Sequence, residues 1–215
     1  MLGTTALAQQ DSIASAKNRQ SSIQLNLGTQ GIGAEFNYGL SSQLALRAGA
    51  SFVLPIPVNN VFKIDDFKST TSIKGDFQNI HLLLDFTPIK NAAWLRLVGG
   101  AAYFLTAEGK VKVTPTDNYN YGDLILTQDQ VGYLDMNIDW KGVAPYFGLG
   151  LGRVIPKNKF NINFDLGTYY LSSPKASIAG TGLLSGNSSQ SEQFQSNLSD
   201  YKWLPVLQLN LNFKL

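Results

Sequence analysis

Six ionisable side chains of the sequence share a pattern that could do chemistry. Each takes the hydrophilic place in a stretch where every second residue is large and apolar, so in a β-strand each would point to the polar side. Carboxylates, guanidinium groups and an imidazole on one side can form ion pairs, and an imidazole beside a carboxylate could also assist hydrolysis. Charges in a narrow interior are costly unless they are paired, so we expect a salt-bridged network. The six residues are Glu35, Arg47, His81, Asp85, Arg96 and Asp165.

Alternation with a period of two recurs along the chain and predicts the strands that position these residues. In the closing stretch every odd position from Leu207 is Leu or Phe, with Gln, Asn or Lys between. The phase of the alternation changes across residues 28–31, which requires a turn or a bulge. We interpret it as a turn after a short first strand, residues 21–27; one long bulged strand is the alternative. The other expected strands lie within residues 32–38, 44–52, 79–86, 95–105, 146–152, 160–170 and 201–215.

Short and long connections alternate between these strands. Short ones are expected near residues 39–42, 88–93 and 156–159, and long polar ones near residues 55–71, 110–141 and 172–200. This arrangement is typical of an up-and-down antiparallel barrel with short periplasmic turns and long extracellular loops. The predicted fold class is therefore all-β, a closed transmembrane β-barrel of about eight strands.

The composition of the two faces decides which one is outside. Only 15% of residues are charged and 44% are hydrophobic, whereas the surface of a soluble barrel is rich in Lys and Glu. The polar face instead carries Gly, Ala, Ser, Asn and Gln, which suits a lumen filled by side chains without an open pore. We therefore expect the apolar face to meet lipid. Aromatic residues near the strand ends fit interfacial girdles, namely Tyr38, Trp94, Phe160, Tyr170, Tyr201 and Trp203.

The two short-turn hairpins allow a prediction of register. A turn centred on Ser41 would place Glu35 opposite Arg47, and the next short turn would place Asp85 opposite Arg96. Both pairs would then point inward, where Asp165 could join them.

Other chemistry finds little support in the sequence. The net charge of +2 gives no case for nucleic acid, and the absence of cysteine excludes disulfides and thiolate metal sites. The glycines of "GLGLG", residues 148–152, superficially resemble a phosphate-binding loop, but no helix follows to bind the phosphate. We expect them to lie on a strand and to face the lumen of the barrel. Asp65 and Asp66 are interpreted as solvated charges, and residues 114–139 as a hydrated loop that could bind a ligand or cation. Residues 185–200 could form a short polar helix. No cofactor or metal is expected.

The N-terminus resembles the end of a secretory signal. Residues 1–8 end in the A-x-A motif Ala6-Leu7-Ala8, although a disordered terminus is the alternative. We therefore divide the chain into a signal remnant (1–8), a flexible polar segment (9–20) and the barrel (21–215).

A family resemblance rests on three stretches. They are "QGIGAEFNYGLSSQLALRAGASF", "VAPYFGLGLGRVI" with "FNINFDLGTYYLSSPKASIAGTG", and the closing "DYKWLPVLQLNLNFKL". Together they resemble the small bacterial outer-membrane β-barrel proteins and OmpA/OmpW-like membrane domains. The resemblance implies insertion by the barrel-assembly machinery, which reads a final aromatic residue. Here Leu215 is last and Phe213 stands two residues before it.

These observations lead to an expected function. The chain is expected to be a non-enzymatic integral outer-membrane protein of a Gram-negative bacterium, in contact with lipid and lipopolysaccharide. Its role would be structural or would involve a surface ligand at the long loops. The alternatives are a barrel that binds or transports a small ligand, a lipid-modifying enzyme, and a soluble lipocalin-like carrier.

Overall fold

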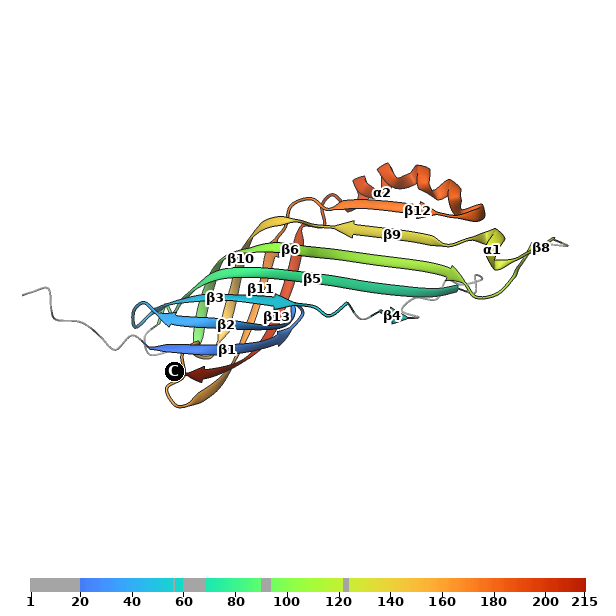
Figure 1. Cartoon of the computed structure of the whole chain (residues 1–215). Coiled ribbons are helices and arrows are strands. Elements are labelled where there is room, and N and C mark those ends of the chain that lie inside the picture. Colours follow the sequence, from blue (N-terminus) through green and yellow to red (C-terminus); the bar gives the residue numbers. More distant parts are fainter. Residues whose placement is uncertain (1–19, 56, 60–68, 90–93, 122–123) are drawn as a thin grey trace, which may run out of the picture.

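The computed structural model of the 215-residue chain describes residues 20–55, 57–59, 69–89, 94–121 and 124–215 (Figure 1). The proposed signal remnant, almost all of the polar N-terminal segment, and Asp65 and Asp66 lie outside these ranges. The described part is dominated by antiparallel β-structure. None of its helices is long and apolar enough to span a membrane.

Eight strands pair with one another in a ring. Each is antiparallel to both of its neighbours, and pairing of the first strand with the last and of β5 with β6 completes the circuit. In ring order they are β1 (Ser21–Gly28), β2 (Gly31–Gly39), β3 (Leu44–Phe52), β5 (Ser69–Phe86), β6 (Leu95–Pro115), β10 (Gly142–Leu151), β11 (Phe160–Tyr170) and β13 (Trp203–Lys214).

The phase change near residue 30 is a hairpin turn. Strands β1 and β2 pair from Ser21 opposite Tyr38 to Gly28 opposite Gly31. Gly31 has a φ of 84°, and a Cβ at this position would lie 2.0 Å from the carbonyl oxygen of Phe52. Only glycine fits this turn without strain. The separate first strand is thus confirmed, and the alternative of one long bulged strand is wrong.

The ring has the polar face inside. In β13 the side chains of Leu207 and Leu209 are 47% and 51% exposed, whereas Gln208 is 5% and Asn210 0% exposed. The same alternation holds in the other ring strands, where the outward positions are mostly exposed Leu, Ile, Val and Phe. The orientation expected from composition is confirmed, and it is the opposite of the orientation that a water-soluble carrier needs.

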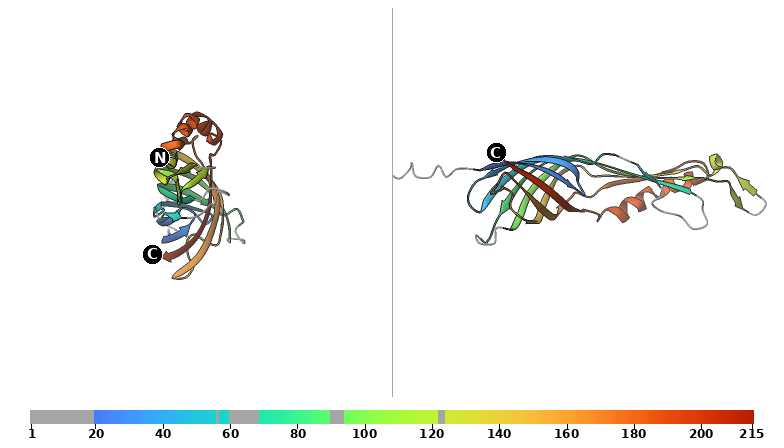
Figure 2. Two further views of the ribbon diagram at one scale, coloured as in Figure 1. Left: turned by 90° about the vertical axis from the view of Figure 1, so that its right-hand side faces the viewer. Right: turned by 90° about the horizontal axis from the view of Figure 1, so that it is seen from below.

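Strands β5 and β6 continue far beyond the ring. Strand β3 pairs with β5 only as far as Gln78, and β10 pairs with β6 only as far as Phe104. Past these points β9 (Leu134–Asp139) pairs with β6, β12 (Lys175–Gly180) with β9, and the short β4 (Val58–Asn59) with β5. We call this sheet, with its helices, the extension; Figures 1 and 2 show it leaving one side of the ring.

The extension corrects the prediction of long hydrated loops. Much of residues 110–141 and 172–200 is strand or helix, although a short period-two pattern is visible in Leu134, Met136 and Ile138. A bulge places one extra residue of β6 between Gln78 and Asn79 of β5, so Gln78 pairs with Thr106 and Asn79 with Phe104. A one-residue shift swaps the faces of a strand. Beyond Leu105, the outward face of β6 is therefore charged and no longer apolar.

Short helices accompany the extension. They are α1 (Gln128–Val131), the 3-10 helix η1 (Gly182–Gln190) and α2 (Ser191–Leu198), with a separate hairpin of β7 (Tyr119–Tyr121) and β8 (Leu124–Leu126). The polar helix expected within residues 185–200 is confirmed by α2. Helix α2 lies alongside β12 (Figure 1).

Side chains of this helical segment cover the outer edge of β12. The amide N–H groups of Ala176 and Ile178 donate to Gln195 Oε1 at 2.6 Å and to Ser191 Oγ at 3.3 Å. The N–H of Gly180 donates to Ser188 Oγ at 3.1 Å. An exposed strand edge is a template for unwanted pairing, so these bonds protect the extension from self-association.

Candidate functional site: a buried charge network

The ring interior brings all six of the ionisable residues singled out in the sequence into one cluster. They come from five strands: β2 supplies Glu35, β3 supplies Arg47, and β6 supplies Arg96. Strand β5 contributes His81 and Asp85, and β11 contributes Asp165. All six are buried.

Arg47 is the centre of the cluster. Its Nη1 lies 2.7 Å from Asp165 Oδ2 and 3.3 Å from Glu35 Oε2, and its Nε lies 2.7 Å from Asp85 Oδ2. One guanidinium group therefore faces three carboxylates that come from three other strands. The several donors of one guanidinium group therefore connect strands on opposite sides of the ring.

Arg96 links two of the same carboxylates from the other side. Its Nη1 pairs with Asp85, its Nη2 lies 2.8 Å from Asp165 Oδ1, and its Nε donates to the carbonyl oxygen of Gly152 at 2.6 Å. Asp85 and Asp165 are thus each shared by the two arginines. Removal of either arginine would leave three buried carboxylates with a single arginine.

The predicted hairpin registers are wrong by two residues. Arg47 lies opposite Asn37, with Glu35 opposite Gly49, and Asp85 lies opposite Val98. A shift of two residues keeps every side chain on its face, so the pairs still meet, along diagonals of the sheet. The turn centres could not be located more closely from the sequence, because several residues of each turn tolerate the same conformations.

His81 belongs to the Glu35 side of the cluster. Its Nε2 lies 3.2 Å from Glu35 Oε1 and its Nδ1 lies 2.9 Å from Asn79 Oδ1. Glu35 also accepts hydrogen bonds from Gln24, Asn26 and Gln208 at 3.0, 2.8 and 3.1 Å. This carboxylate is saturated with donors, so it is held in place as an acceptor of hydrogen bonds.

A shell of amide side chains surrounds the ions; the sequence predicted that Asn and Gln fill the lumen, but it did not predict that they bind the carboxylates. Asn210 donates to Asp165 Oδ2 at 2.9 Å and to Asn163 Oδ1 at 2.6 Å, and Asn37 donates to Ser22 Oγ at 3.1 Å. The signal was present in the inward positions of the first and last strands, five of which are Asn or Gln. The buried members are Gln24, Asn26, Gln30, Asn37, Asn79, Asn163, Gln208, Asn210 and Asn212.

Inward-facing glycines make room for the largest side chains. A Cβ on Gly150 would lie 2.4 Å from Arg96 Cζ, and a Cβ on Gly167 would lie 2.3 Å from the hydroxyl of Tyr146. The "GLGLG" stretch therefore lies on β10 as expected, with Gly148 and Gly150 turned to the interior. Its role is to give space to a guanidinium group and a phenol, with no helix that could bind a phosphate.

Apolar and aromatic side chains, which we call the aromatic plug, pack together inside the ring on the side of the extension. Phe104 packs edge-on against Tyr169, with ring centroids 5.3 Å apart, and Tyr146 lies 4.8 Å from Tyr169. Leu83 and Val206 belong to the same buried cluster. The sequence predicted a lumen of small and polar residues, but it did not predict this aromatic layer.

The turn between β10 and β11 packs against the interior at the opposite end of the ring. Val154 is buried there, and its carbonyl oxygen accepts from Ser22 Oγ at 3.2 Å. The carbonyl oxygen of Arg153 accepts from Asn161 and Asn163 at 2.8 and 2.9 Å. The charge network thus lies between the aromatic plug and this folded turn.

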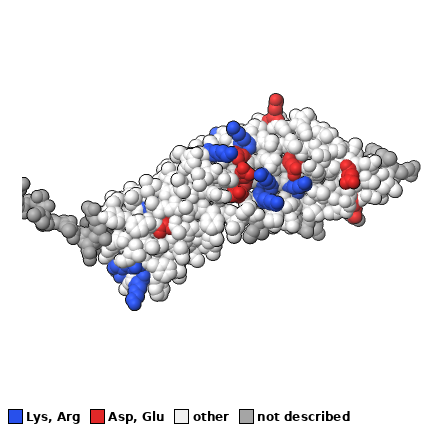
Figure 3. All heavy atoms as spheres, in the orientation of Figure 1, with Lys and Arg blue, Asp and Glu red and all other residues white. Residues whose placement is uncertain are grey.

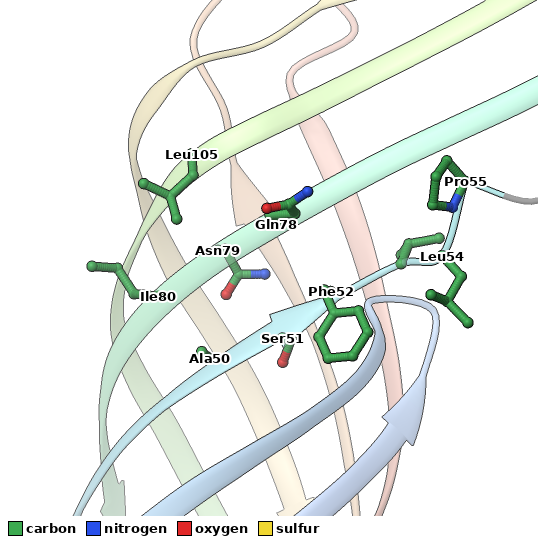
Figure 4. A pocket seen from close by; sticks show the side chains of 10 residues that line it. Ala50, Ser51, Phe52, Leu54, Pro55, Gln78, Asn79, Ile80 and Leu105 are labelled. Carbon is green, nitrogen blue, oxygen red and sulfur yellow. The ribbon is translucent and has the colours of Figure 1, made fainter.

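A pocket of about 350 Å³ lies elsewhere, on the outer wall where β3 ends (Figure 4). Leu105, the extra residue of the bulge, and Ile80 line one side, and Phe52 and Leu54 line the other. None of its lining residues is ionisable, so it offers shape for an apolar group and no catalytic chemistry. Within the described ranges, no three His, Asp or Glu side chains are placed to hold a metal ion.

Comparison with known proteins supports the fold. No protein-family model and no curated protein sequence matches the chain. The crystal structure of Acinetobacter baumannii CarO2 matches with a TM-score of 0.68 at 20% identity, over 91% of this chain and 98% of that one. Acinetobacter baumannii CarO matches with a TM-score of 0.64 at 21% identity, over 89% and 96%. A major outer membrane protein from Thermus thermophilus reaches only 0.46 at 11% identity, over 92% and 100%. At these identities the first two likenesses establish a shared fold.

Proposed function

We propose that the chain is an integral protein of the bacterial outer membrane and that its ring is a closed transmembrane barrel. The observation that carries the proposal is the inverted distribution of polarity. The outward wall exposes Leu, Ile, Val and Phe, while Asn, Gln and charged residues are buried inside. In hydrocarbon every backbone N–H and C=O must be paired within the protein, and a ring of strands satisfies this condition.

The dimensions of the wall fit a bilayer. Strand β13 has 12 residues, which at about 3.3 Å per residue and a tilt of about 40° spans about 30 Å along the membrane normal. Exposed aromatic residues lie at both ends of this span: Phe160 is paired with Phe213, and Tyr170 with Trp203. Figure 3 shows charged atoms gathered on the extension and at the opposite end, with an almost uncharged wall between them.

The filled interior supports a non-enzymatic role without an open channel. The aromatic plug and the folded turn leave the ion network between two closures, and the carboxylates are engaged by arginine and amide donors. We assign the short turns to the periplasm and the extension to the cell exterior, where it can meet lipopolysaccharide or a surface ligand. A transport role is the second candidate, favoured only by the apolar pocket beside Ile80.

Membrane fractionation tests the location. When expressed with a secretory signal, the protein should sediment with outer membranes, require detergent for extraction, and run faster on gels before boiling than after. Barrel folding should require the assembly machinery. Recovery as a soluble periplasmic protein that runs identically before and after boiling would contradict the proposal.

Planar-bilayer recording separates a sealed barrel from a transporter. The purified protein should insert without producing stepwise conductance. Reproducible open channels would favour the transport function. The His81→Ala variant should leave the pattern of lipid A species unchanged. An altered pattern would favour the alternative of a lipid-modifying enzyme.

A further inference from the structure

The short-turn end of the ring carries a group of basic side chains, which we call the basic rim. Arg153, Lys157 and Lys159 belong to the turn between β10 and β11, and Lys214 ends β13. The first three are exposed and Lys214 is partly exposed. Figure 3 shows basic atoms gathered at this end of the molecule.

Backbone hydrogen bonds hold the rim together. The N–H of Lys214 donates to the carbonyl oxygen of Lys159 at 2.9 Å, so these two residues are neighbours across adjacent strands. The carbonyl oxygen of Arg153 is held by Asn161 and Asn163, which fixes the start of the turn against β11. The four basic residues therefore lie at one corner of the ring.

Charge at this corner is unbalanced. None of the four basic side chains forms an ion pair with any described residue. The carboxylates Asp85 and Asp165 are buried and already bound by Arg47 and Arg96. On the extension, by contrast, Lys110 and Lys141 have acidic partners, Glu108 and Asp139.

The corner also borders the apolar wall. Phe160 follows Lys159 directly, Phe213 precedes Lys214, and the two phenylalanines lie opposite each other, 62% and 42% exposed. A lysine next to an outward aromatic pair can hold a phosphate while the rings contact acyl chains. This is the chemistry of an anionic lipid headgroup at a membrane surface.

We propose that the basic rim binds anionic phospholipid, through its phosphate, in the leaflet next to the short turns. The inference rests on the proposed membrane location. The four cations anchor the barrel at that leaflet and fix its depth in the bilayer. A polybasic patch beside a membrane gains affinity with each Lys or Arg, so loss of all four should have a large effect.

Native mass spectrometry of the full chain in non-ionic detergent tests the proposal. The probe is phosphatidylglycerol, compared with zwitterionic phosphatidylcholine. The variant Arg153→Gln/Lys157→Gln/Lys159→Gln/Lys214→Gln should bind phosphatidylglycerol at least tenfold more weakly than wild type, with phosphatidylcholine unaffected. A charge-preserving variant, Lys157→Arg/Lys159→Arg/Lys214→Arg, should bind like wild type.

The matched control removes the same number of exposed cations from the extension, as Lys74→Gln/Lys110→Gln/Lys112→Gln/Lys175→Gln, and should leave lipid binding unchanged. Equal losses in both variants, or no loss in the rim variant, would overturn the proposal. So would full displacement of the lipid by millimolar inorganic phosphate, which would mark a site for the free anion. If the chain is not a membrane protein at all, wild type will stay soluble without detergent, and this result is distinct from a loss of lipid binding.

Discussion

Strands β5 and β6 run through both halves of the molecule, and their outward faces change character where they leave the ring. On β5 the outward residues Ile80, Leu82 and Leu84 give way to Asp76 and Lys74 beyond the ring. The hydrogen-bonded ladder between the strands continues through this change, with one bulge. One continuous ladder therefore carries two kinds of outward face, and the boundary between them is marked by the bulge and by the change of side chains.

The two regions also keep their polar groups in different places. The ring buries arginines and carboxylates inside and exposes leucines, whereas the extension exposes its charges and uses polar side chains to cover the edge of β12. A buried ion pair and an exposed ion pair have similar geometry but very different energetic consequences. Substitutions that match in chemistry and differ in region can therefore test the division.

The largest effect is expected from removing the central arginine of the ring. Arg47→Met leaves Glu35, Asp85 and Asp165 without their shared donor, and breaking such a buried pair costs about 3–5 kcal/mol in the free energy of unfolding. Urea unfolding in detergent or lipid measures this loss. The control is Lys112→Met in the extension, where the ammonium lies 3.9 Å from the ring centroid of Tyr133, and it should cost below about 1 kcal/mol. A similar loss in both variants would remove the distinction between the regions.

A smaller but still large effect is expected from a charge on the outer wall. Leu209 lies near the middle of β13, and an arginine at a lipid-facing midplane position of a barrel costs about 2–4 kcal/mol. Leu209→Arg should therefore reduce the fraction of folded protein recovered in outer membranes. Leu183→Arg in η1, where the leucine is 63% exposed, should have no such effect. If Leu209→Arg folds and inserts like wild type, the wall does not face lipid.

The ring could be predicted in outline because a strand with one apolar face leaves a period-two signal. The alternation of Leu207 with Gln208 separated the two faces, their composition predicted which one is outside, and the change of phase near Gly31 indicated the extra strand. The inward side of the six ionisable residues followed from the same parity. The alternation did not predict the hairpin register, because a shift of two residues leaves Glu35 and Arg47 on the same face.

The extension and the aromatic plug left weaker signals. The added strands of the extension are short and mix Lys, Asp and Asn with Leu, Met and Ile, so their sequences are equally compatible with a polar loop. The aromatic plug depends on how Tyr146 and Tyr169 meet across the ring and on the space left by Gly167, which no single segment reveals. Contacts between distant strands thus set the limit of prediction from local pattern.

A moderate and local effect is expected at the edge of β12. Ser191→Ala/Gln195→Ala removes acceptors from the N–H groups of Ala176 and Ile178, and each lost hydrogen bond is worth about 1 kcal/mol. Hydrogen exchange at these two amides should accelerate about fivefold, while exchange in the ring strands stays unchanged. The control, Gln193→Ala/Ser196→Ala, alters exposed side chains of the same types on α2 and should leave both amides protected. Unchanged exchange in the first variant would show that the helix does not cover the edge in solution.

The smallest effect is expected at the exposed ion pair between Lys110 and Glu108, whose Nζ and Oε2 atoms lie 2.9 Å apart. The hydrogen bond that Lys110 donates to Glu108, together with the negative charge of that carboxylate, raises the pKa of Lys110 above its ordinary value. Because the folded-state pKa is raised, the pairing contributes below that pKa and its contribution is lost as the pH rises through it. Glu108→Gln should return the pKa of Lys110 toward the ordinary value, as followed by NMR titration of the lysine side chain.

The urea midpoint of the Glu108→Gln variant at neutral pH should not change, since solvent screens the pair. A fall in that midpoint comparable to that of Arg47→Met would mean that charges on the extension stabilise the protein as strongly as those inside the ring, and the contrast between the two regions would fail.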